Sequence, residues 1–339
     1  MTAVHVRVPA STSNLGAGFD CVGIAVDRWL TVTVHLDASS ETVQISREGT
    51  LSSLGIAPND DRILVGFLAA CAYARREALP GITVRASSTI PIARGLGSSA
   101  AATVAGAVAA NVLLELALDD ATIAGIATTV EGHPDNVAPA VFGGATLALA
   151  SRDGELQVRQ LAVSPRLSLV LATPDFPVET AHARAVLPAS VPHHVASRAV
   201  ALGAALVQGL ATADGSLLAA ALDDVLHVPF RRDLVPGLDT VVDAARAAGA
   251  YGASLSGSGS AIVAIAPREL AAPVAQAMCS AWDSVGVAAS AFESPTNISG
   301  YEVTHHSSIG EESWPSPSTS PPFLPSSPTV KRSKRAVQP

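Results

Sequence analysis

Lysine is almost absent from this chain. Its 339 residues include two lysines, Lys331 and Lys334, and both lie close to the C-terminus. A phosphate-binding loop of the G-x-x-x-x-G-K-[ST] type carries its own lysine, and a protein-kinase fold carries one on a strand of its first lobe. Both arrangements are excluded for the chain before Lys331. Any nucleotide phosphates bound there must be held by backbone amides, hydroxyl groups, arginines or Mg²⁺.

Cysteine, aromatic residues and positive charge are also scarce. Cys21, Cys71 and Cys279 are far apart and odd in number, so they predict neither a disulfide framework nor a metal-binding cluster. The net charge of −8 argues against a nucleic-acid-binding protein, which needs a basic surface. Aromatic residues make up 4% and hydrophobic residues 48%, which predicts a globular body packed mainly from small side chains.

Patterns typical of export and of membrane insertion are missing from the sequence. Residues 1–9 are short and interrupted by polar residues, unlike a signal peptide. The most apolar stretch, residues 100–118, is rich in alanine and contains Asn111 and Glu115, which favours a buried helix over a membrane span. We therefore expect a cytoplasmic protein that binds neither membrane nor nucleic acid. Whether it forms a homodimer is left open.

The apolar pattern predicts a mixed α/β body followed by a tail. Alternating residues predict a strand at 4–8, and a buried strand is predicted at 167–172. Asp153-Gly154, between two apolar runs, is a hairpin signal. Residues 307–328 are rich in serine and proline and have no periodicity, so we expect the end of the chain to be disordered.

A glycine-rich loop before a strongly helical run carries the first chemical signal. Gly95 and Gly97 let the backbone turn tightly and approach a ligand, and Ser98 and Ser99 fall at the helix N-terminus, where amides favour an anion. Glycines alone would also suit a structural turn, but a helix cap needs neither the glycine pair nor the second serine. The segment reads Pro91-Ile92-Ala93-Arg94-Gly95-Leu96-Gly97-Ser98-Ser99-Ala100-Ala101.

This loop resembles the phosphate-loop motif P-x-x-x-G-L-G-S-S-A-A of the GHMP small-molecule kinases and matches it throughout. Two further motifs follow in the family's order. Residues 9–20 read P-A-S-T-S-N-L-G-A-G-F-D, and residues 249–260 read G-A-Y-G-A-S-L-S-G-S-G-S. The resemblance covers roughly residues 4–293. The later glycines do not form the G-x-G-x-x-G of a dinucleotide-binding fold.

The resemblance implies an α+β fold of two lobes. A ribosomal-S5-like α/β lobe is expected over residues 1–160 and a ferredoxin-like lobe over residues 161–295. A disordered tail is expected over residues 296–339. ATP and the substrate would meet in the cleft between the two lobes.

The resemblance also implies ATP and Mg²⁺ as cofactors. Residues 91–101 would bind the ATP phosphates, and Ser98 and Glu131 would hold Mg²⁺. The sequence leaves open whether Ser98 or Ser99 is the metal ligand, and we favour Ser98. Mg²⁺ is usually held by one or two protein oxygens together with phosphate oxygens, which suits one glutamate and one serine.

Four segments resemble the branch of the family that phosphorylates L-homoserine, a step of threonine biosynthesis. They are Asn14 with Asp20, the E-G-H-P-D-N-V-A-P-A of residues 131–140, residues 179–188, and the L-H-V-P-F-R of residues 226–231. Val228 replaces the glutamate that is usual in this branch. Another GHMP kinase, or an inactive binding or regulatory protein of the same fold, remains as an alternative.

The residues implied to bind the substrate are Asn14, Asp20, Asp135, Asn136, Thr180, Arg184 and Arg231. Two of them, Asp20 and Asn136, are implied to be catalytic and would help to place the hydroxyl group. Arg184 and Arg231 would clamp the α-carboxylate through paired hydrogen bonds. Asp20 is the candidate base, since the Asp–Lys pair of some relatives is impossible here. Considered singly, either arginine would also suit a surface salt bridge.

Overall fold

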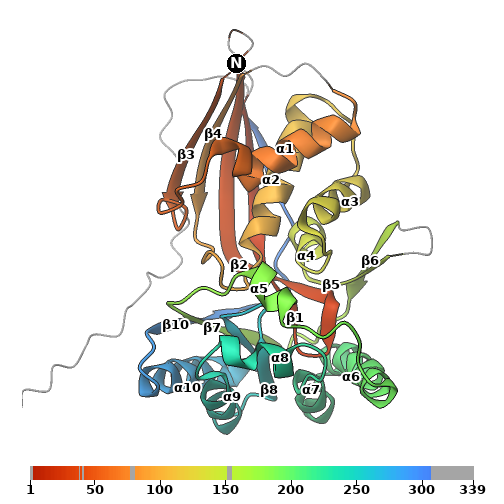
Figure 1. Cartoon of the computed structure of the whole chain (residues 1–339), viewed down its shortest axis with the longest axis vertical. Helices are drawn as coiled ribbons and strands as arrows, with labels where there is room; N and C mark the ends of the chain where they lie inside the picture. Colours follow the sequence, from red (N-terminus) through yellow and green to blue (C-terminus); the bar gives the residue numbers. More distant parts are fainter. Residues whose placement is uncertain (1–2, 38, 40–41, 77–80, 151–154, 307–339) are drawn as a thin grey trace, which may run out of the picture.

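Two sheets, each covered by helices, form two lobes that are stacked along the long axis of the molecule (Figure 1). The computed structural model describes residues 3–37, 39, 42–76, 81–150 and 155–306. The turn expected at Asp153-Gly154 and the serine- and proline-rich segment from residue 307 lie outside these residues. The α+β fold with two lobes is confirmed.

The first lobe is built on a seven-stranded sheet in the order β11-β1-β2-β4-β3, in which β5 also pairs with β2 and β6 pairs with β5. A bulge at Asp27 and Arg28 interrupts the pairing of β1 with β2. These two residues have no partner where the register moves from the Pro9–Trp29 pair to the Ala10–Val26 pair. The strands are β1 (Ala3–Asn14), β2 (Gly18–Asp37), β3 (Val43–Gly49), β4 (Gly81–Ser88), β5 (Ala145–Ala150), β6 (Leu156–Leu161) and β11 (Glu302–His306).

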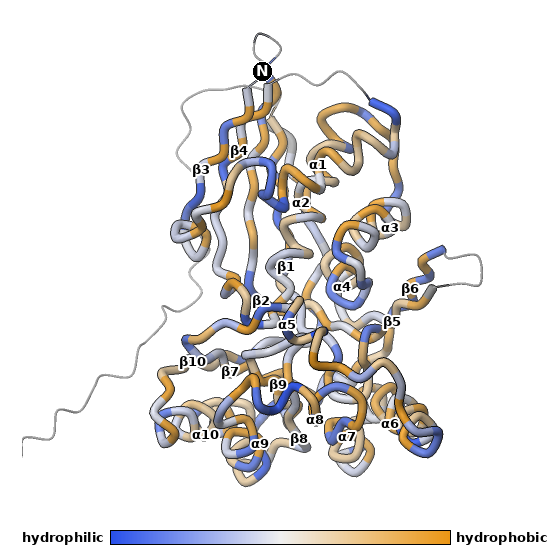
Figure 2. Tube along the Cα trace, in the orientation of Figure 1, coloured by the Kyte–Doolittle hydropathy of each residue, from blue (hydrophilic) through white to orange (hydrophobic). Residues whose placement is uncertain are grey.

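Helix α2 runs through the middle of the first lobe and begins at the phosphate loop (Figure 1). Its small residues let α1 approach closely, since an added Cβ at Gly106 would lie 1.8 Å from the Ile63 carbonyl oxygen. In Figure 2, α2 is drawn mostly in neutral to hydrophobic colours. The helices of this lobe are α1 (Arg62–Tyr73), α2 (Ser98–Leu113), α3 (Asp120–Glu131), α4 (Val137–Phe142) and the short 3-10 turn Pro58–Asp60.

The second lobe has an antiparallel four-stranded sheet in the order β10-β7-β9-β8. The chain passes through these strands as β7, helices, β8, β9, helix and β10, which is the ferredoxin-like connection that was expected. The strands are β7 (Leu167–Pro174), β8 (Gly252–Leu255), β9 (Ile262–Pro267) and β10 (Ala289–Ser294). The helices are α5 (Thr180–Ala185), α6 (His193–Thr212), α7 (Gly215–Leu222), α8 (Val228–Arg231), α9 (Leu238–Ala247), α10 (Ala271–Ser284) and the 3-10 turns Arg232–Leu234 and Arg268–Leu270.

One hydrophobic cluster spans both lobes, and a second lies within the second lobe. Strand β7 is buried along its whole length. Leu169 and Leu171, on one face of β7, belong to the cluster that also contains the core of the first lobe. Val170, on the opposite face, packs in a second cluster with Trp282 of α10. The phosphate loop and the second lobe are therefore held together by packing as well as by the chain.

One boundary expected from the sequence is wrong. The expected tail began at residue 296, but the chain returns to the first lobe and Glu302–His306 forms β11, antiparallel to β1. Before this strand, the Gly144 N–H donates to the Ile298 carbonyl and the Tyr301 N–H donates to the Ala140 carbonyl. This segment lacks the length of apolar periodicity that would have indicated a strand.

Helix α6, at the surface of the second lobe, is long and apolar enough to cross a membrane by length and composition alone. A minority of its residues are buried. Leu206 and Leu210 are fully buried on the side that packs on α7, and Gly209 leaves room for Leu218 of that helix. The absence of membrane contact stays a prediction.

Candidate active site

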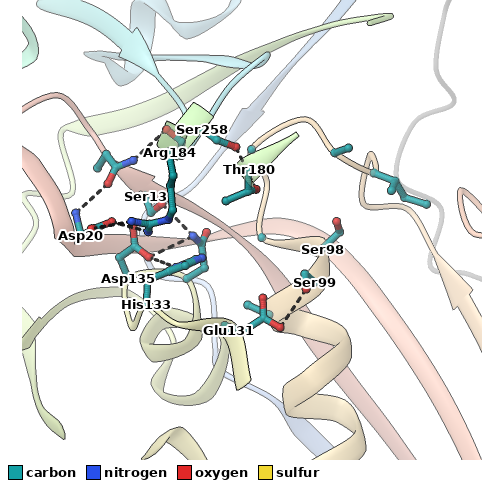
Figure 3. A pocket seen from close by; sticks show the side chains of 18 of the residues that line it. Ser13, Asp20, Ser98, Ser99, Glu131, His133, Asp135, Thr180, Arg184 and Ser258 are labelled. Carbon is teal, nitrogen blue, oxygen red and sulfur yellow. Dashed lines mark hydrogen bonds and ion pairs between the residues drawn. The ribbon is translucent and has the colours of Figure 1, made fainter. Parts of the chain in front are cut away.

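A cavity of about 250 Å³ is lined by segments that lie far apart in the sequence (Figure 3). The walls come from the β1–β2 turn, the phosphate loop, the ends of α3, α5 and α8, and the loop after β8. The structure brings these predicted residues together in its walls: Asn14, Asp20, Ile92, Ala93, Gly95, Gly97, Ser98, Ser99, Ala100, Glu131, Asp135, Asn136, Thr180, Arg184 and Arg231.

The phosphate loop is fixed by the loop that follows β8. Gly95 has φ +74°, and a Cβ added there would lie 1.9 Å from the Ser256 carbonyl oxygen. The Gly95 carbonyl accepts a hydrogen bond from the Ser256 hydroxyl at 2.7 Å. Gly97 has φ +65° and precedes the first residue of α2. Both glycines therefore have the positive φ and the close approach that favour glycine.

Four residues of the predicted loop do not line the cavity. Leu96 and Ala101 are buried in the core. The Arg94 guanidinium donates to the carbonyls of Pro174 and Asp175 at 2.9 and 2.6 Å, and so ties the loop to the second lobe. Pro91, where the motif begins, also lies outside the cavity lining. Arg94 thus binds the second lobe and does not line the cavity.

Glu131 lies at the floor of the cavity beside the first turns of α2. Its Oε1 accepts hydrogen bonds from the Ser99 hydroxyl at 2.9 Å and the Thr103 hydroxyl at 2.7 Å. The Arg62 guanidinium is 4.0 Å from the same oxygen. Ser98 also lines the cavity, above Ser99 in Figure 3. One carboxylate with nearby hydroxyl groups is a set of hard oxygen donors that fits Mg²⁺. No group of three or more His, Cys, Asp or Glu suited to a metal occurs among the described residues.

A second cavity of about 180 Å³ adjoins the first and was not expected from the sequence. The two share Ile92, Ser98 and Ser99. Its apolar walls come from β2, the segment after β3 and the start of α1, where no motif marks them. They are Leu30, Leu51, Leu54, Ile56 and Ile63.

The β1–β2 turn holds its two polar residues in strained backbone conformations. Asn14 has φ 70° and Asp20 has φ 55°, values that non-glycine residues seldom adopt. The Asn14 amide accepts the Asp20 N–H at 3.0 Å and donates to the Gly257 carbonyl at 2.9 Å. The turn is thereby tied to the loop after β8.

Arg184 pairs with Asp20 across the lobe boundary. Its Nη1 and Nη2 donate to the two carboxylate oxygens at 3.1 and 2.8 Å. This hydrogen-bonded pairing raises the pKa of Arg184. Thr180, one turn earlier on α5, lies 3.4 Å from the Ser258 hydroxyl. Arg184 was expected to face a substrate carboxylate, and its partner in the structure is a protein carboxylate.

Arg231 is buried at the opposite wall, with 2% of the residue exposed. It donates to the Ala183 carbonyl at 2.9 Å and to the Gly257 carbonyl at 3.3 Å. Burial lowers the pKa of this guanidinium, and the nearby Arg184 lowers it further. Among the described residues no carboxylate lies within ion-pair distance of it, although the charges of Asp20, Asp135 and Asp224 favour its cationic form and its guanidinium carbon lies 5.4 Å from the Phe19 ring centroid.

His133, Asp135 and Asn136 form a polar cluster between the two walls. His133 Nδ1 is 2.6 Å from Asp135 Oδ1. Burial favours the neutral form of Asp135, but the hydrogen bond and charge of His133 outweigh it and lower the Asp135 pKa. Burial likewise opposes the charge on His133, and Asp135 raises the pKa of this imidazole above its usual value. The Asn136 amide donates to the Ser13 hydroxyl at 2.9 Å.

Sequence reasoning missed His133, Ser13, Gly257 and Ser258 as cavity residues, although each lies inside a quoted motif. Motif letters do not show which side chains turn inward. The walls they complete combine backbone amides and hydroxyls at one end with carboxylates and guanidinium groups at the other. Such an arrangement can bind a polyanion beside a small molecule that carries both charges.

Family models match both lobes of the chain. Residues 64–144 match the N-terminal domain of the GHMP kinases, and residues 206–284 match their C-terminal domain. The chain is 39% identical over 287 residues to a homoserine kinase from Synechococcus sp., covering 84% of this chain and 92% of that protein. It is 40% identical over 285 residues to a homoserine kinase from Moorella thermoacetica, covering 83% and 93%.

A solved structure shows the same likeness. The crystal structure of homoserine kinase from Cytophaga hutchinsonii superposes with a TM-score of 0.80 at 32% sequence identity, covering 89% of this chain and 97% of that one. The similarity therefore extends over both lobes and the cavity that they enclose.

Proposed function

Because the chain belongs to the GHMP kinase family, in its homoserine kinase branch, we propose that it transfers the γ-phosphoryl group of ATP to the side-chain hydroxyl of L-homoserine. The products are ADP and O-phospho-L-homoserine. The enzyme is an ATP-dependent small-molecule kinase. Its cytoplasmic location remains an expectation.

The buried charge of Arg231 is the observation that carries the choice of substrate. A guanidinium that is buried and paired only with carbonyl oxygens and an imidazole leaves a site for an anion. The α-carboxylate of an amino acid would pair with it in a planar geometry. A neutral sugar has no group of this charge, whereas mevalonate and shikimate share the carboxylate but lack the ammonium group of homoserine.

Two carboxylates lie where the substrate ammonium group would be placed. Asp135 is held ionised by His133, and Asp20 lines the same cavity. In the free protein Asp20 is bound by Arg184. We infer that homoserine binds between Arg184 and Asp20. Arg184 would then pair with the carboxylate of the substrate, and Asp20 with its ammonium group.

The reaction needs alignment and charge stabilisation more than covalent catalysis. The amides at the start of α2 and the glycines of the phosphate loop hold the γ-phosphate, while Asn14 and Asn136 place the attacking hydroxyl. Asp20, which lines the cavity, is the candidate base for the hydroxyl proton. Lysine takes no part, because none occurs before Lys331.

Glu131, with Ser98 or Ser99, would hold Mg²⁺, which neutralises phosphate charge when it is bound. The Ser99 bond to Glu131 favours Ser99 as the hydroxyl that orients this carboxylate, whereas Ser98 stays the candidate ligand. The adjoining apolar cavity would take the adenine base, since it meets the phosphate loop at Ser98 and Ser99.

An assay of ADP release across homoserine, mevalonate, galactose and shikimate tests the proposal. We expect homoserine alone to give sustained, substrate-dependent turnover. Turnover with another alcohol and none with homoserine would assign a different GHMP kinase. No turnover with any of them, together with measurable ATP binding, would favour an inactive binding protein.

A further inference from the structure

We propose that His227 is a positioning residue that orients Arg231 toward the substrate carboxylate and fixes the distance between Arg231 and the Asp20 turn. This inference rests on the proposed function, because it concerns how the substrate carboxylate is recognised. His227 does not line the cavity, and it acts through the residues that do.

His227 is completely buried, with none of the residue exposed. Its ring stacks on Phe19 with centroids 5.1 Å apart and an interplanar angle of 21°. The Asp224 carboxylate accepts hydrogen bonds from the backbone N–H groups of Leu226, His227 and Val228 at 2.6 to 3.0 Å. The backbone on either side of the imidazole is thus fixed before any ligand binds.

Its two ring nitrogens have partners that determine the tautomer. Nε2 lies 3.1 Å from the Gly16 carbonyl oxygen, which can only accept, so Nε2 carries the proton and donates. Nδ1 lies 3.3 Å from Arg231 Nη1, which can only donate, so Nδ1 is unprotonated and accepts. A neutral imidazole with its proton on Nε2 satisfies both groups.

The two bonds connect opposite ends of the substrate site. Gly16 belongs to the turn that carries Asp20, while Arg231 lies on α8 of the second lobe. The Ala17 N–H also donates to the Ala221 carbonyl at 3.0 Å, so this turn rests on the second lobe beside His227. His227 thus contacts both the turn and the arginine, beside Phe19, whose ring centroid also lies 5.4 Å from the Arg231 guanidinium carbon.

Burial is the main reason that His227 is neutral. Burial lowers its pKa, and Arg231 lowers it further, whereas Asp224, the Gly16 carbonyl and Asp20 oppose this shift. A proton on Nδ1 would point at the Arg231 guanidinium and remove its acceptor. The guanidinium would then turn away from the direction in which the substrate carboxylate approaches.

Two substitutions separate the two bonds, because glutamine and asparagine amides reach different ring positions. His227→Gln places a donor near the Nε2 position and keeps the Gly16 contact, but it removes the acceptor for Arg231. His227→Asn places an amide oxygen near the Nδ1 position and keeps that acceptor. Thermal unfolding establishes that each variant is folded before kinetics are measured.

The probe is 3-aminopropan-1-ol, which has the amine and hydroxyl of homoserine but no carboxylate. We measure the KM of homoserine and the competitive inhibition constant of this analogue at saturating ATP. His227→Gln should raise the homoserine KM about tenfold, the value of one weakened charge-assisted hydrogen bond. The inhibition constant of the analogue and the KM of ATP should stay within about twofold. His227→Asn should keep most of the preference for homoserine.

An unchanged homoserine KM in His227→Gln would overturn the inference. So would an equal loss of homoserine and analogue binding, since that would mean general damage to the site. Failure of the unmodified enzyme to phosphorylate homoserine would instead refute the proposed function. If His227→Gln does not fold, nitrogen NMR of the unmodified protein still decides. The neutral Nε2–H form is expected at neutral pH, and an imidazolium or an Nδ1–H form would contradict it.

Discussion

Arg184 and Asp20 are joined by hydrogen bonds in the free protein. Arg184 therefore has to release the Asp20 carboxylate before it can bind the carboxylate of the substrate. Arg184→Ala should raise the homoserine KM about tenfold to a hundredfold, because charge-assisted hydrogen bonds to the carboxylate are lost. The KM of ATP should change little, since Arg184 lies on α5, outside the phosphate loop. Initial rates with each substrate varied in turn measure both constants.

Arg198→Ala is a matched control, because this exposed arginine lies 3.9 Å from Asp223 on the surface of the second lobe. It should leave both constants unchanged. An Arg184→Ala enzyme with unaltered homoserine KM would show that Arg184 serves only to hold Asp20.

Glu131 offers a second test at the scale of one residue. Glu131→Gln keeps the size of the side chain and an oxygen for the Ser99 and Thr103 hydroxyls, but it removes the charge that suits Mg²⁺. We expect turnover to fall by about a hundredfold and the Mg²⁺ concentration for half-maximal rate to rise. A magnesium titration of the initial rate measures both effects.

Glu269→Gln removes the same charge from an exposed 3-10 turn of the second lobe and should have no effect. If Glu131→Gln responds to magnesium as the unmodified enzyme does, Glu131 is not a metal ligand. The Ser99 and Thr103 bonds would then have only a structural role.

Strand β11 lies in the segment that the sequence predicted to be a disordered tail, and we expect its removal to destabilise the protein. A chain that ends after His306 keeps the β1–β11 pairing and should retain the melting temperature of the full chain. A chain that ends after Ser294 loses this pairing and the Tyr301 hydroxyl contact to Asp120 at 2.5 Å. We expect its unfolding free energy to fall by about 2 kcal/mol or more, lowering the melting temperature by roughly 4–8 °C.

Thermal unfolding of the two shortened chains, side by side, checks this prediction. Both lack the serine- and proline-rich segment, so any difference between them belongs to residues 295–306. Equal melting temperatures would mean that β11 adds nothing to the first lobe. A loss already present in the longer chain would show that residues 307–339 contribute to the body.

Elements with a local signal were predicted well, and elements defined by distant partners were not. The sequence pattern predicts a helix that is capped by Asp119 or Asp120 and ends at Gly132, and in the structure Asp119 caps α3 by accepting the Thr122 N–H while Gly132 has φ +82°. These signals act within one turn of helix. Strand β11 depends on β1, about 300 residues earlier in the chain, and nothing within its own five residues indicates that partner.

The same contrast applies to the candidate site at the scale of the whole molecule: features within a motif were predicted, and features that depend on distant partners were not. Motifs placed the phosphate loop, Glu131 and the arginines in one cavity, because each motif carries its own chemistry. They did not show that Arg184 would pair with Asp20, or that an apolar cavity would adjoin Ser98. Both depend on how the two lobes pack, which is a property of the shared core.

That shared core predicts that the two lobes unfold together. Leu171 of the second lobe lies in the same buried cluster as the strands of the first lobe, so the core of the first lobe is completed by residues of the second. Each lobe carries one tryptophan as a reporter, Trp29 on β2 and Trp282 on α10. The third tryptophan of the chain, Trp314, is removed by Trp314→Phe. Adding either Trp29→Phe or Trp282→Phe then leaves a single tryptophan in each protein.

In each single-tryptophan protein, urea unfolding followed by fluorescence should have the same midpoint as unfolding followed by circular dichroism. Leu171→Ala should lower both midpoints together, since a buried leucine replaced by alanine costs about 2–5 kcal/mol. The substitution removes packing at the face of β7 that meets the first lobe, so Trp29 should report it although Leu171 lies in the second lobe. If only the Trp282 midpoint moved, the lobes would unfold independently, and the cavity between them would be held together by the site residues rather than by the core.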